Sequence, residues 1–125
     1  MLILDTDVLV EIMDKKSRKG EEILRRIEKV GEEIAITSIT LHEILYGIYK
    51  YGKKVPEELL QLETIEFMPK DAILSAKLEL DAERKGKKVT RMDCMIAAIV
   101  MNRNAKLYTL NEKHFEVFEN LLLFK

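Results

Sequence analysis

The sequence lacks most features that mark exported, membrane-bound or disulfide-stabilised proteins. Its 125 residues include one cysteine, Cys94, so no disulfide can form within the chain. No run of about 18 apolar residues occurs, as a membrane-spanning helix would require. The apolar start is interrupted by Asp5 and Asp7 and has neither a basic leader nor a small-residue cleavage site. We therefore expect a cytoplasmic protein that does not enter a membrane.

An excess of charge of one sign is also missing. The chain carries 21 basic and 22 acidic residues, for a formal net charge of -1. Any binding of nucleic acid must therefore come from local patches and not from overall attraction. His42, His114 and Cys94 stand far apart in the sequence, so no spacing typical of a zinc site is present.

Short apolar segments alternate with longer segments of helical period. The alternation predicts an α/β fold in which helices cover a parallel sheet. With 47% hydrophobic residues the chain is long enough for one well-buried core, so we expect a single domain over residues 1–125. The predicted strands lie within residues 2–5, 33–38, 64–68, 105–110 and 121–124.

The helical segments carry recognisable start and stop signals. Apolar residues recur at helical spacing in segments 18–31 and 40–52, which end at Gly31 and Gly52. Pro56 and Pro69 each open a further helix, and the second runs to Gly86. Residues 91–104 are apolar on almost every side, which predicts a helix buried over most of its surface.

Polar residues gather where the predicted strands end. Asp5 and Asp7 follow the first strand, Thr37 and Ser38 close the second and precede Glu43, and Thr109 and Asn111 follow the fourth. Asp93 lies in the first turn of the most apolar helix. Ligands of open parallel sheets bind beyond the carboxyl ends of the strands, so these residues are candidate ligands of a hard divalent cation.

Helix capping is the alternative explanation for each acid taken singly. Residues 40–43 (TLHE) and 90–93 (TRMD) both fit the capping box, in which a hydroxyl and an acid satisfy the first turn of a helix. Asp7 and Asn111 could likewise be simple N-caps. The set of acids, without an obvious basic counterpart, favours a metal site.

Four blocks of the sequence resemble the PIN-domain ribonucleases, in particular the VapC-type toxins of toxin–antitoxin pairs. The blocks are LILDTDVLVEI, AITSITLHEILYGI, KGKKVTRMDCMIAA and LYTLNEKHFEVF, in the family's order and spanning nearly the whole chain. The resemblance implies a three-layer α/β/α fold with a central parallel sheet of four or five strands. It also implies a divalent-metal-dependent endoribonuclease, a homodimer, and a cognate antitoxin that occludes the acidic pocket.

The resemblance also assigns roles to residues. Asp5, Glu43 and Asp93 correspond to the acidic triad that binds Mg²⁺ or Mn²⁺. The metal would activate a water molecule and neutralise charge on the phosphate. Asn111 stands where the family often has a fourth acid, and His114 where an acid often precedes the last phenylalanine. The residues expected to support the site are Thr6, Asp7, Ser38, Thr109 and Glu112.

An acidic site repels RNA, so a basic approach surface is needed. The densest basic segment precedes Asp93 and contains Lys87, Lys88 and Arg91, which we predict to contact RNA phosphates, with Arg84, Lys85 and Arg103 nearby. An exposed loop of solvated charges is the alternative. On the segment that carries Glu43, Gly47 and the tyrosines Tyr46, Tyr49 and Tyr51 are candidates for a contact surface with partners. Ordinary packing within the chain is the alternative.

Two other functions compete with the nuclease. A phosphohydrolase of the haloacid-dehalogenase kind would use Asp5 as a nucleophile, but it needs Thr or Val where Leu9 stands and a paired acid motif that residues 91–95 lack. A catalytically silent PIN-fold module that binds RNA or protein is the second alternative, with Asn111 as the first sign of lost catalysis.

Overall fold

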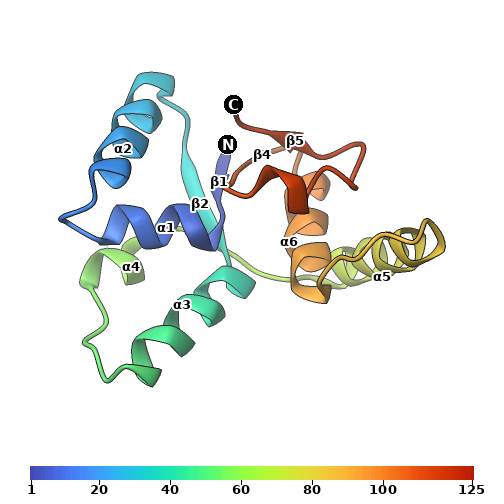
Figure 1. Ribbon diagram of the computed structural model, residues 1–125, viewed down its shortest axis with the longest axis horizontal. Helices are drawn as coiled ribbons and strands as arrows, with labels where there is room; N and C mark the ends of the chain where they lie inside the picture. Colours follow the sequence, from blue (N-terminus) through green and yellow to red (C-terminus); the bar gives the residue numbers. More distant parts are fainter.

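The protein is organised around a five-stranded parallel sheet (Figure 1). A computed structural model describes all 125 residues. The strand order is β3-β2-β1-β4-β5, and every neighbouring pair is parallel. The strands are β1 (Leu2–Leu4), β2 (Ile34–Thr37), β3 (Thr64–Ile65), β4 (Lys106–Tyr108) and β5 (Leu122–Leu123). All five predicted strands are present, although β3 and β5 are shorter than their apolar segments.

Six α-helices and one 3₁₀ helix connect the strands. Helices α1 to α4 lie on one side of the sheet in Figure 1, and α5 and α6 on the other, which is the three-layer arrangement expected from the sequence. None of the helices has the length and apolarity needed to span a bilayer. The helices are α1 (Thr6–Met13), α2 (Arg18–Val30), α3 (Ser38–Lys50), α4 (Glu57–Gln61), α5 (Pro69–Arg84), α6 (Arg91–Asn102) and η1 (Glu112–His114).

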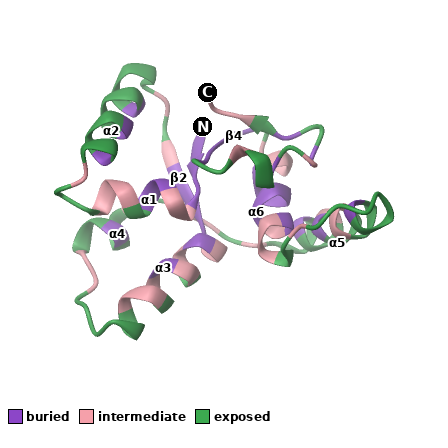
Figure 2. Cartoon of the chain, in the orientation of Figure 1, coloured by how far each residue is buried: buried purple, intermediate pink, exposed green.

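Strand β1 has no polar side chain because both of its faces are covered. Side chains alternate across a strand, so Leu2 and Leu4 join the core beneath α1, α2 and α3, whereas Ile3 joins the core formed with α6. All three are buried, as expected for a central parallel strand. Figure 2 shows the same distribution, with buried residues concentrated in the sheet and in α6.

Helices α1 and α2 approach closely at a glycine. A Cβ atom on Gly20 would clash with the backbone carbonyl of Glu11, so only glycine fits between the two helices. Ser17 caps α2 by accepting a hydrogen bond from the Gly20 amide, at 3.0 Å. The helix ends at Gly31, whose φ of 68° is the left-handed conformation typical of a glycine stop. The predicted stop is confirmed.

Helices α5 and α6 are joined by a buried ion pair that the sequence did not suggest. Asp71 is fully buried and accepts hydrogen bonds from Arg103 Nη1 at 2.7 Å and Nη2 at 3.0 Å. Asn102 and the Met68 amide complete its partners, each at 2.8 Å. These donors hold the pKa of Asp71 at about 2 even though its burial acts in the opposite direction.

Candidate active site

Asp5 stands at the carboxyl end of β1, where the strand order of the sheet reverses. The strands lead from β1 through β2 to β3 on one side, and from β4 to β5 on the other. Ligands of open α/β sheets bind at such a reversal. Asp5 Oδ1 accepts the Thr6 amide at 2.8 Å and caps α1, and Oδ2 accepts the Thr109 hydroxyl from the end of β4, also at 2.8 Å. The carboxylate is thereby fixed between the two central strands.

The Asp5 carboxylate is buried without a cationic partner. The residue is 8% exposed. Burial is the largest cause that raises its pKa from 3.8 to about 6, and the negative charges of Asp7 and Asp93 raise the pKa further. The two hydrogen bonds lower the pKa without cancelling these effects. A buried acid surrounded by other acids is a position where a bound cation is stabilising.

Asp7 connects the start of α1 to the loop after β4. Its carboxylate accepts the Leu110 amide at 3.2 and 3.3 Å and lies 3.4 Å from the Thr109 hydroxyl. The alternative of Asp7 as an N-cap is wrong, because Asp5 occupies that position. Asp7 therefore links the first turn of α1 to the loop that carries Thr109, whose hydroxyl also contacts Asp5.

Glu43 faces the first turn of α1 from the second turn of α3. The Thr6 hydroxyl donates to Glu43 Oε1 at 2.9 Å. The capping-box interpretation of residues 40–43 is wrong, because α3 begins one turn earlier and Thr37 is its cap, accepting the Thr40 amide at 3.1 Å. The Glu43 carboxylate is therefore free for another role. Ser38 accepts the Phe67 amide at 3.2 Å and does not line the acidic pocket.

Asp93 lies in the first turn of α6, and only half of its predicted capping box forms. The Thr90 hydroxyl accepts the Asp93 amide at 3.1 Å, but the Asp93 carboxylate makes no return bond to the Thr90 backbone. The carboxylate instead lies 3.9 Å from His114 Nδ1. Burial raises the pKa of Asp93, and Asp7 adds to the rise. Capping alone does not account for this side chain.

His114 is a pocket residue that sequence reasoning set aside as isolated. Asn111 Nδ2 lies 2.9 Å from His114 Nδ1, and the Asn111 backbone amide donates to the Thr109 hydroxyl at 3.1 Å. The position of His114 directly before Phe115, where the family often has an acid, was the available signal. Glu112 points elsewhere, toward Lys125 Nζ at 3.7 Å, and does not line the pocket.

These side chains surround an open pocket of about 240 Å³. No lysine or arginine forms an ion pair with any of its four acids, and His114 is the only basic group in contact with one of them. The residues lining the pocket are Asp5, Thr6, Asp7, Glu43, Asp93, Asn111, His114 and Phe115. The structure thus brings together the three predicted metal ligands and Asn111 from four separate segments of the chain.

The donor set of the pocket fits a hard divalent cation. It consists of carboxylate and amide oxygens, the ligands preferred by Mg²⁺ and Mn²⁺, around a buried and uncompensated carboxylate. No three histidine, cysteine, aspartate or glutamate side chains converge closely enough to ligate one ion together. One or two direct carboxylate ligands with water completing the shell, as is common for Mg²⁺, agree with this spacing.

The basic segment before Asp93 is less available than its sequence suggested. Arg91 is engaged by Glu79 through three hydrogen bonds of 3.0 to 3.3 Å. Lys85 lies 3.0 Å from Asp81, and Arg103 is held by Asp71. Lys87 and Lys88 are exposed and form no ion pair. The residues of this segment that remain free for phosphates are therefore Arg84, Lys87 and Lys88.

Comparison with known proteins places this arrangement in a family. The model of the PIN domain matches residues 2–120. Ribonuclease VapC2 of Rickettsia felis is 33% identical over 127 residues, covering 97% of this chain and 94% of the relative. The tRNA(fMet)-specific endonuclease VapC of Salmonella typhimurium is 30% identical over 122 residues, with 91% and 89% covered.

A solved structure agrees with these relatives. VapBC2 from Rickettsia felis, bound to a DNA fragment from its promoter, includes a chain that is 30% identical to this one, with a TM-score of 0.80. The match covers 98% of this chain and 96% of that chain. The strand order and the acidic pocket are consistent with the PIN-domain match over residues 2–120. The chain belongs to the PIN-domain family.

Proposed function

We propose that this protein is a divalent-metal-dependent endoribonuclease and the toxin of a toxin–antitoxin pair. It hydrolyses RNA phosphodiester bonds as a single PIN-like domain over residues 1–125 and acts in the cytoplasm, where RNA is available. The observation that carries the proposal is the buried, uncompensated Asp5 carboxylate in a pocket of acids. Membership of the PIN-domain family and the similarity to VapC ribonucleases support it.

Asp5, Glu43 and Asp93 are the residues that would hold Mg²⁺ or Mn²⁺, one or two of them as direct ligands and the others through water. The bound ion supplies an activated water and neutralises charge on the phosphate. The chain itself positions the carboxylates. Thr109 orients Asp5 and Thr6 orients Glu43 through hydrogen bonds of 2.8 and 2.9 Å. Asn111 and His114 also line the pocket, and in this proposal their side chains contact the RNA backbone.

A protein partner regulates this activity in our proposal. The solved neighbours include VapBC from Rickettsia felis and from Salmonella typhimurium and a toxin–antitoxin complex from Klebsiella pneumoniae. They support a cognate antitoxin as the partner of this chain. We further propose a homodimer. Tyr46 and Tyr49 of α3 are 61% and 66% exposed and remain candidates for a contact between protein chains.

The test compares the wild-type protein, purified without antitoxin, with the Asp5→Asn variant on a structured RNA. Cleavage is expected with Mg²⁺ or Mn²⁺, to be abolished by EDTA, and to be lost in Asp5→Asn. Glu22→Gln is the matched control, because Glu22 is an exposed acid on α2 outside the pocket. Equal cleavage by Asp5→Asn and wild type would refute the proposed site.

One observation favours a second candidate function. Asn111 supplies an amide where an acid is common in the family, so the pocket has one charge fewer. A catalytically silent PIN-fold module that binds RNA or protein would tolerate this change. Such a module would bind RNA without cleaving it at any metal concentration, and Asn111→Asp would not restore hydrolysis. The PIN-domain match over residues 2–120 favours either function over a haloacid-dehalogenase-like phosphohydrolase.

A further inference from the structure

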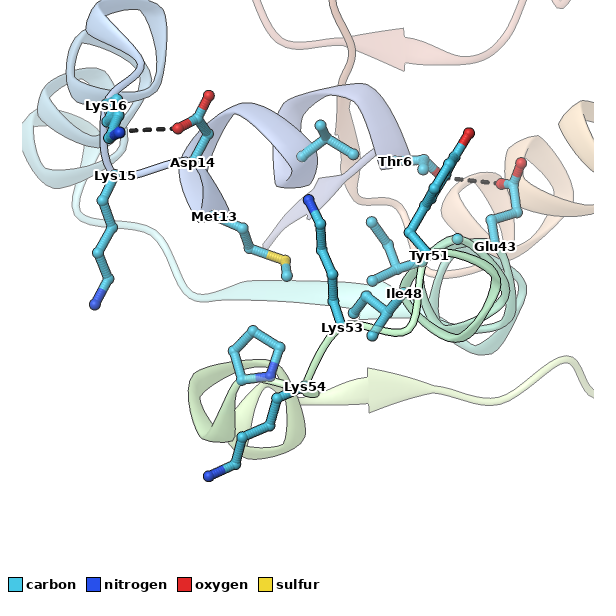
Figure 3. Close-up of a pocket in the computed structure, with 14 residues that line it drawn as sticks. Thr6, Met13, Asp14, Lys15, Lys16, Glu43, Ile48, Tyr51, Lys53 and Lys54 are labelled. Atoms are coloured by element: carbon cyan, nitrogen blue, oxygen red, sulfur yellow. Dashed lines mark hydrogen bonds between the residues drawn. The ribbon is translucent and has the colours of Figure 1, made fainter.

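The acidic pocket is lined by side chains of two chemical kinds. On the side of α1 and α3 the donors are carboxylate and hydroxyl oxygens, and Figure 3 shows the hydrogen bond of 2.9 Å from Thr6 to Glu43. On the side of α6 and η1 the donors are Asp93, Asn111 and His114. Of all residues that line the pocket, only His114 has a side-chain nitrogen with a lone pair that a cation can use.

We propose that His114 is a direct nitrogen ligand of the ion bound at Asp93, and that this ligand makes the pocket prefer Mn²⁺ to Mg²⁺. The inference rests on the proposed metal-dependent ribonuclease function and adds the choice of the ion. Three features carry it: the distance between the two side chains, the fixed turn that holds His114, and the free lone pairs of the Asp93 carboxylate.

The distance between His114 and Asp93 suits an ion placed between them. His114 Nδ1 lies 3.9 Å from Asp93 Oδ2, which is too far for a direct hydrogen bond. Bonds from a divalent transition ion to imidazole nitrogen and to carboxylate oxygen are each about 2.0 to 2.2 Å long, so two of them together span about 4 Å. One ion can therefore contact both atoms without movement of the backbone.

Asn111 lies beside the same ring. Its Nδ2 is 2.9 Å from His114 Nδ1 and 3.3 Å from Nε2. A half-turn of the amide exchanges Nδ2 for Oδ1, an acceptor that can join the ligands of the ion. This side of the pocket then offers one carboxylate, one imidazole and one neutral amide, whereas the opposite side offers carboxylates.

The turn that carries His114 is held in place by the protein itself. The Asn111 amide donates to Thr109 Oγ1 at 3.1 Å, and the His114 amide donates to the Asn111 carbonyl at 3.1 Å. The next residue, Phe115, is 1% exposed and packs against Phe118 in the core. The His114 side chain is 61% exposed, so its replacement should leave the fold intact.

The Asp93 carboxylate has no other strong partner. It accepts no hydrogen bond, and no lysine or arginine forms an ion pair with it. Its side chain is 20% exposed. The carboxylate is thus partly withdrawn from water while its lone pairs remain free, which favours binding of a cation.

An imidazole ligand changes which ion the pocket binds best. Mg²⁺ takes oxygen ligands in proteins, whereas divalent transition ions also accept imidazole nitrogen. A pocket with His114 as a ligand therefore favours Mn²⁺ over Mg²⁺. The second ring nitrogen, Nε2, stays available for the contact with the RNA backbone proposed above.

The experiment records the electron spin echo envelope modulation of Mn²⁺ bound to the protein in the absence of RNA. A directly bound imidazole nitrogen produces a modulation that oxygen ligands do not. The chain has only two histidines, His42 and His114. His42→Gln is the matched control, because His42 is an exposed residue of α3 outside the pocket. The modulation is expected in wild type and in His42→Gln, and it should be absent in His114→Gln.

Calorimetry of the same proteins measures the preference between the ions. His114→Gln is expected to weaken Mn²⁺ binding by at least about tenfold, since even replacement of a residue behind a metal ligand costs about 10- to 100-fold. Its Mg²⁺ affinity should change little. His114→Asp restores a set of oxygen donors and should reduce the ratio of Mn²⁺ to Mg²⁺ affinity. His42→Gln should keep both affinities.

The inference is overturned if wild type with bound Mn²⁺ lacks the histidine modulation, or if His42→Gln removes it. Equal weakening of both ions in His114→Gln would overturn the preference. Tighter binding of both ions in His114→Gln would show that His114 is an ion-pair partner of Asp93 that competes with the metal. A wild-type protein that binds neither ion refutes the proposed metal-dependent function itself. Binding of Mn²⁺ and RNA cleavage without the histidine modulation refute the ligand role alone.

Discussion

Replacement of Asp5 by asparagine should stabilise the metal-free protein at neutral pH while removing its activity. Asparagine keeps the shape of the side chain and can still accept the Thr6 amide and contact the Thr109 hydroxyl. The change removes a negative charge that burial, Asp7 and Asp93 all disfavour. Loss of an ordinary helix cap would instead be destabilising by about 1 kcal/mol.

The size of the effect follows from the pKa of Asp5. In the unfolded chain the carboxyl ionises near its ordinary pKa of 3.8, and in the folded protein near about 6. The folded state holds the Asp5 proton more tightly than the unfolded chain does. The contribution of Asp5 to stability is therefore fully present below pH 3.8 and is lost as the pH rises through about 6. Each pKa unit corresponds to about 1.4 kcal/mol, so ionised Asp5 destabilises the metal-free fold by about 3 kcal/mol.

The assay is urea unfolding in EDTA at pH 4, 6 and 7.5 for wild type, Asp5→Asn and the control Glu22→Gln. Wild type and Asp5→Asn should be close in stability at pH 4. At pH 7.5, Asp5→Asn should be more stable than wild type by about 3 kcal/mol. Metal at about 100 times its dissociation constant should then stabilise wild type by about 2.7 kcal/mol and leave Asp5→Asn unchanged.

A loss of stability in Asp5→Asn at pH 7.5 in EDTA would refute this reasoning. It would mean that the hydrogen bonds accepted by the carboxylate outweigh its burial and its repulsion by the other acids. The same conclusion would follow if the stability difference did not depend on pH.

Four further results are expected. Asp93→Asn should be at least as stable as wild type in EDTA and inactive with metal, because its pKa is raised by burial; a large fall in melting temperature would favour a capping role. Asn111→Asp should lower metal-free stability at neutral pH and strengthen Mn²⁺ binding in calorimetry, since it adds a carboxylate to the pocket. Asp71→Asn should destabilise by about 3 to 5 kcal/mol in urea unfolding, because it leaves Arg103 unpaired in a largely buried position. Gly20→Ala should also lower the urea midpoint, because its Cβ has no space between α1 and α2.

Much of the fold could be predicted because local patterns and tertiary structure agree. The apolar strand at residues 2–4 and the helix at 91–102 are buried on most sides, so continuous hydrophobicity identified both. Gly31 ended α2 as expected, and Pro56 and Pro69 stand at the starts of α4 and α5. In each of these cases the residue type acts through its own backbone and requires no distant partner.

Capping was harder to predict because several hydroxyl residues compete for one helix start. Residues 37–43 contain Thr37, Ser38 and Thr40, and a capping-box pattern fits only the last. The structure places the cap at Thr37 because β2 ends there and the chain turns into α3 at once. Glu43 then lies in the second turn of α3, beyond the amides that a helix cap satisfies. Its side chain faces Thr6 instead.

Contacts between distant segments could not be derived from local pattern. Arg103 looked like a member of the basic surface, but it is held by Asp71, which lies 32 residues earlier. His114 looked isolated, yet the turn at Asn111 brings it beside Asp93. Such pairings depend on the tertiary fold and leave no periodic signal in the sequence.

The two outermost strands of the sheet have a consequence for how the molecule behaves at high concentration. β3 and β5 are two residues long, so each border of the sheet offers very few unpaired backbone groups. A long exposed border would act as a template for strands of other molecules and start aggregation. The borders of the sheet therefore offer little template for aggregation, and we expect association with other chains to use side-chain surfaces.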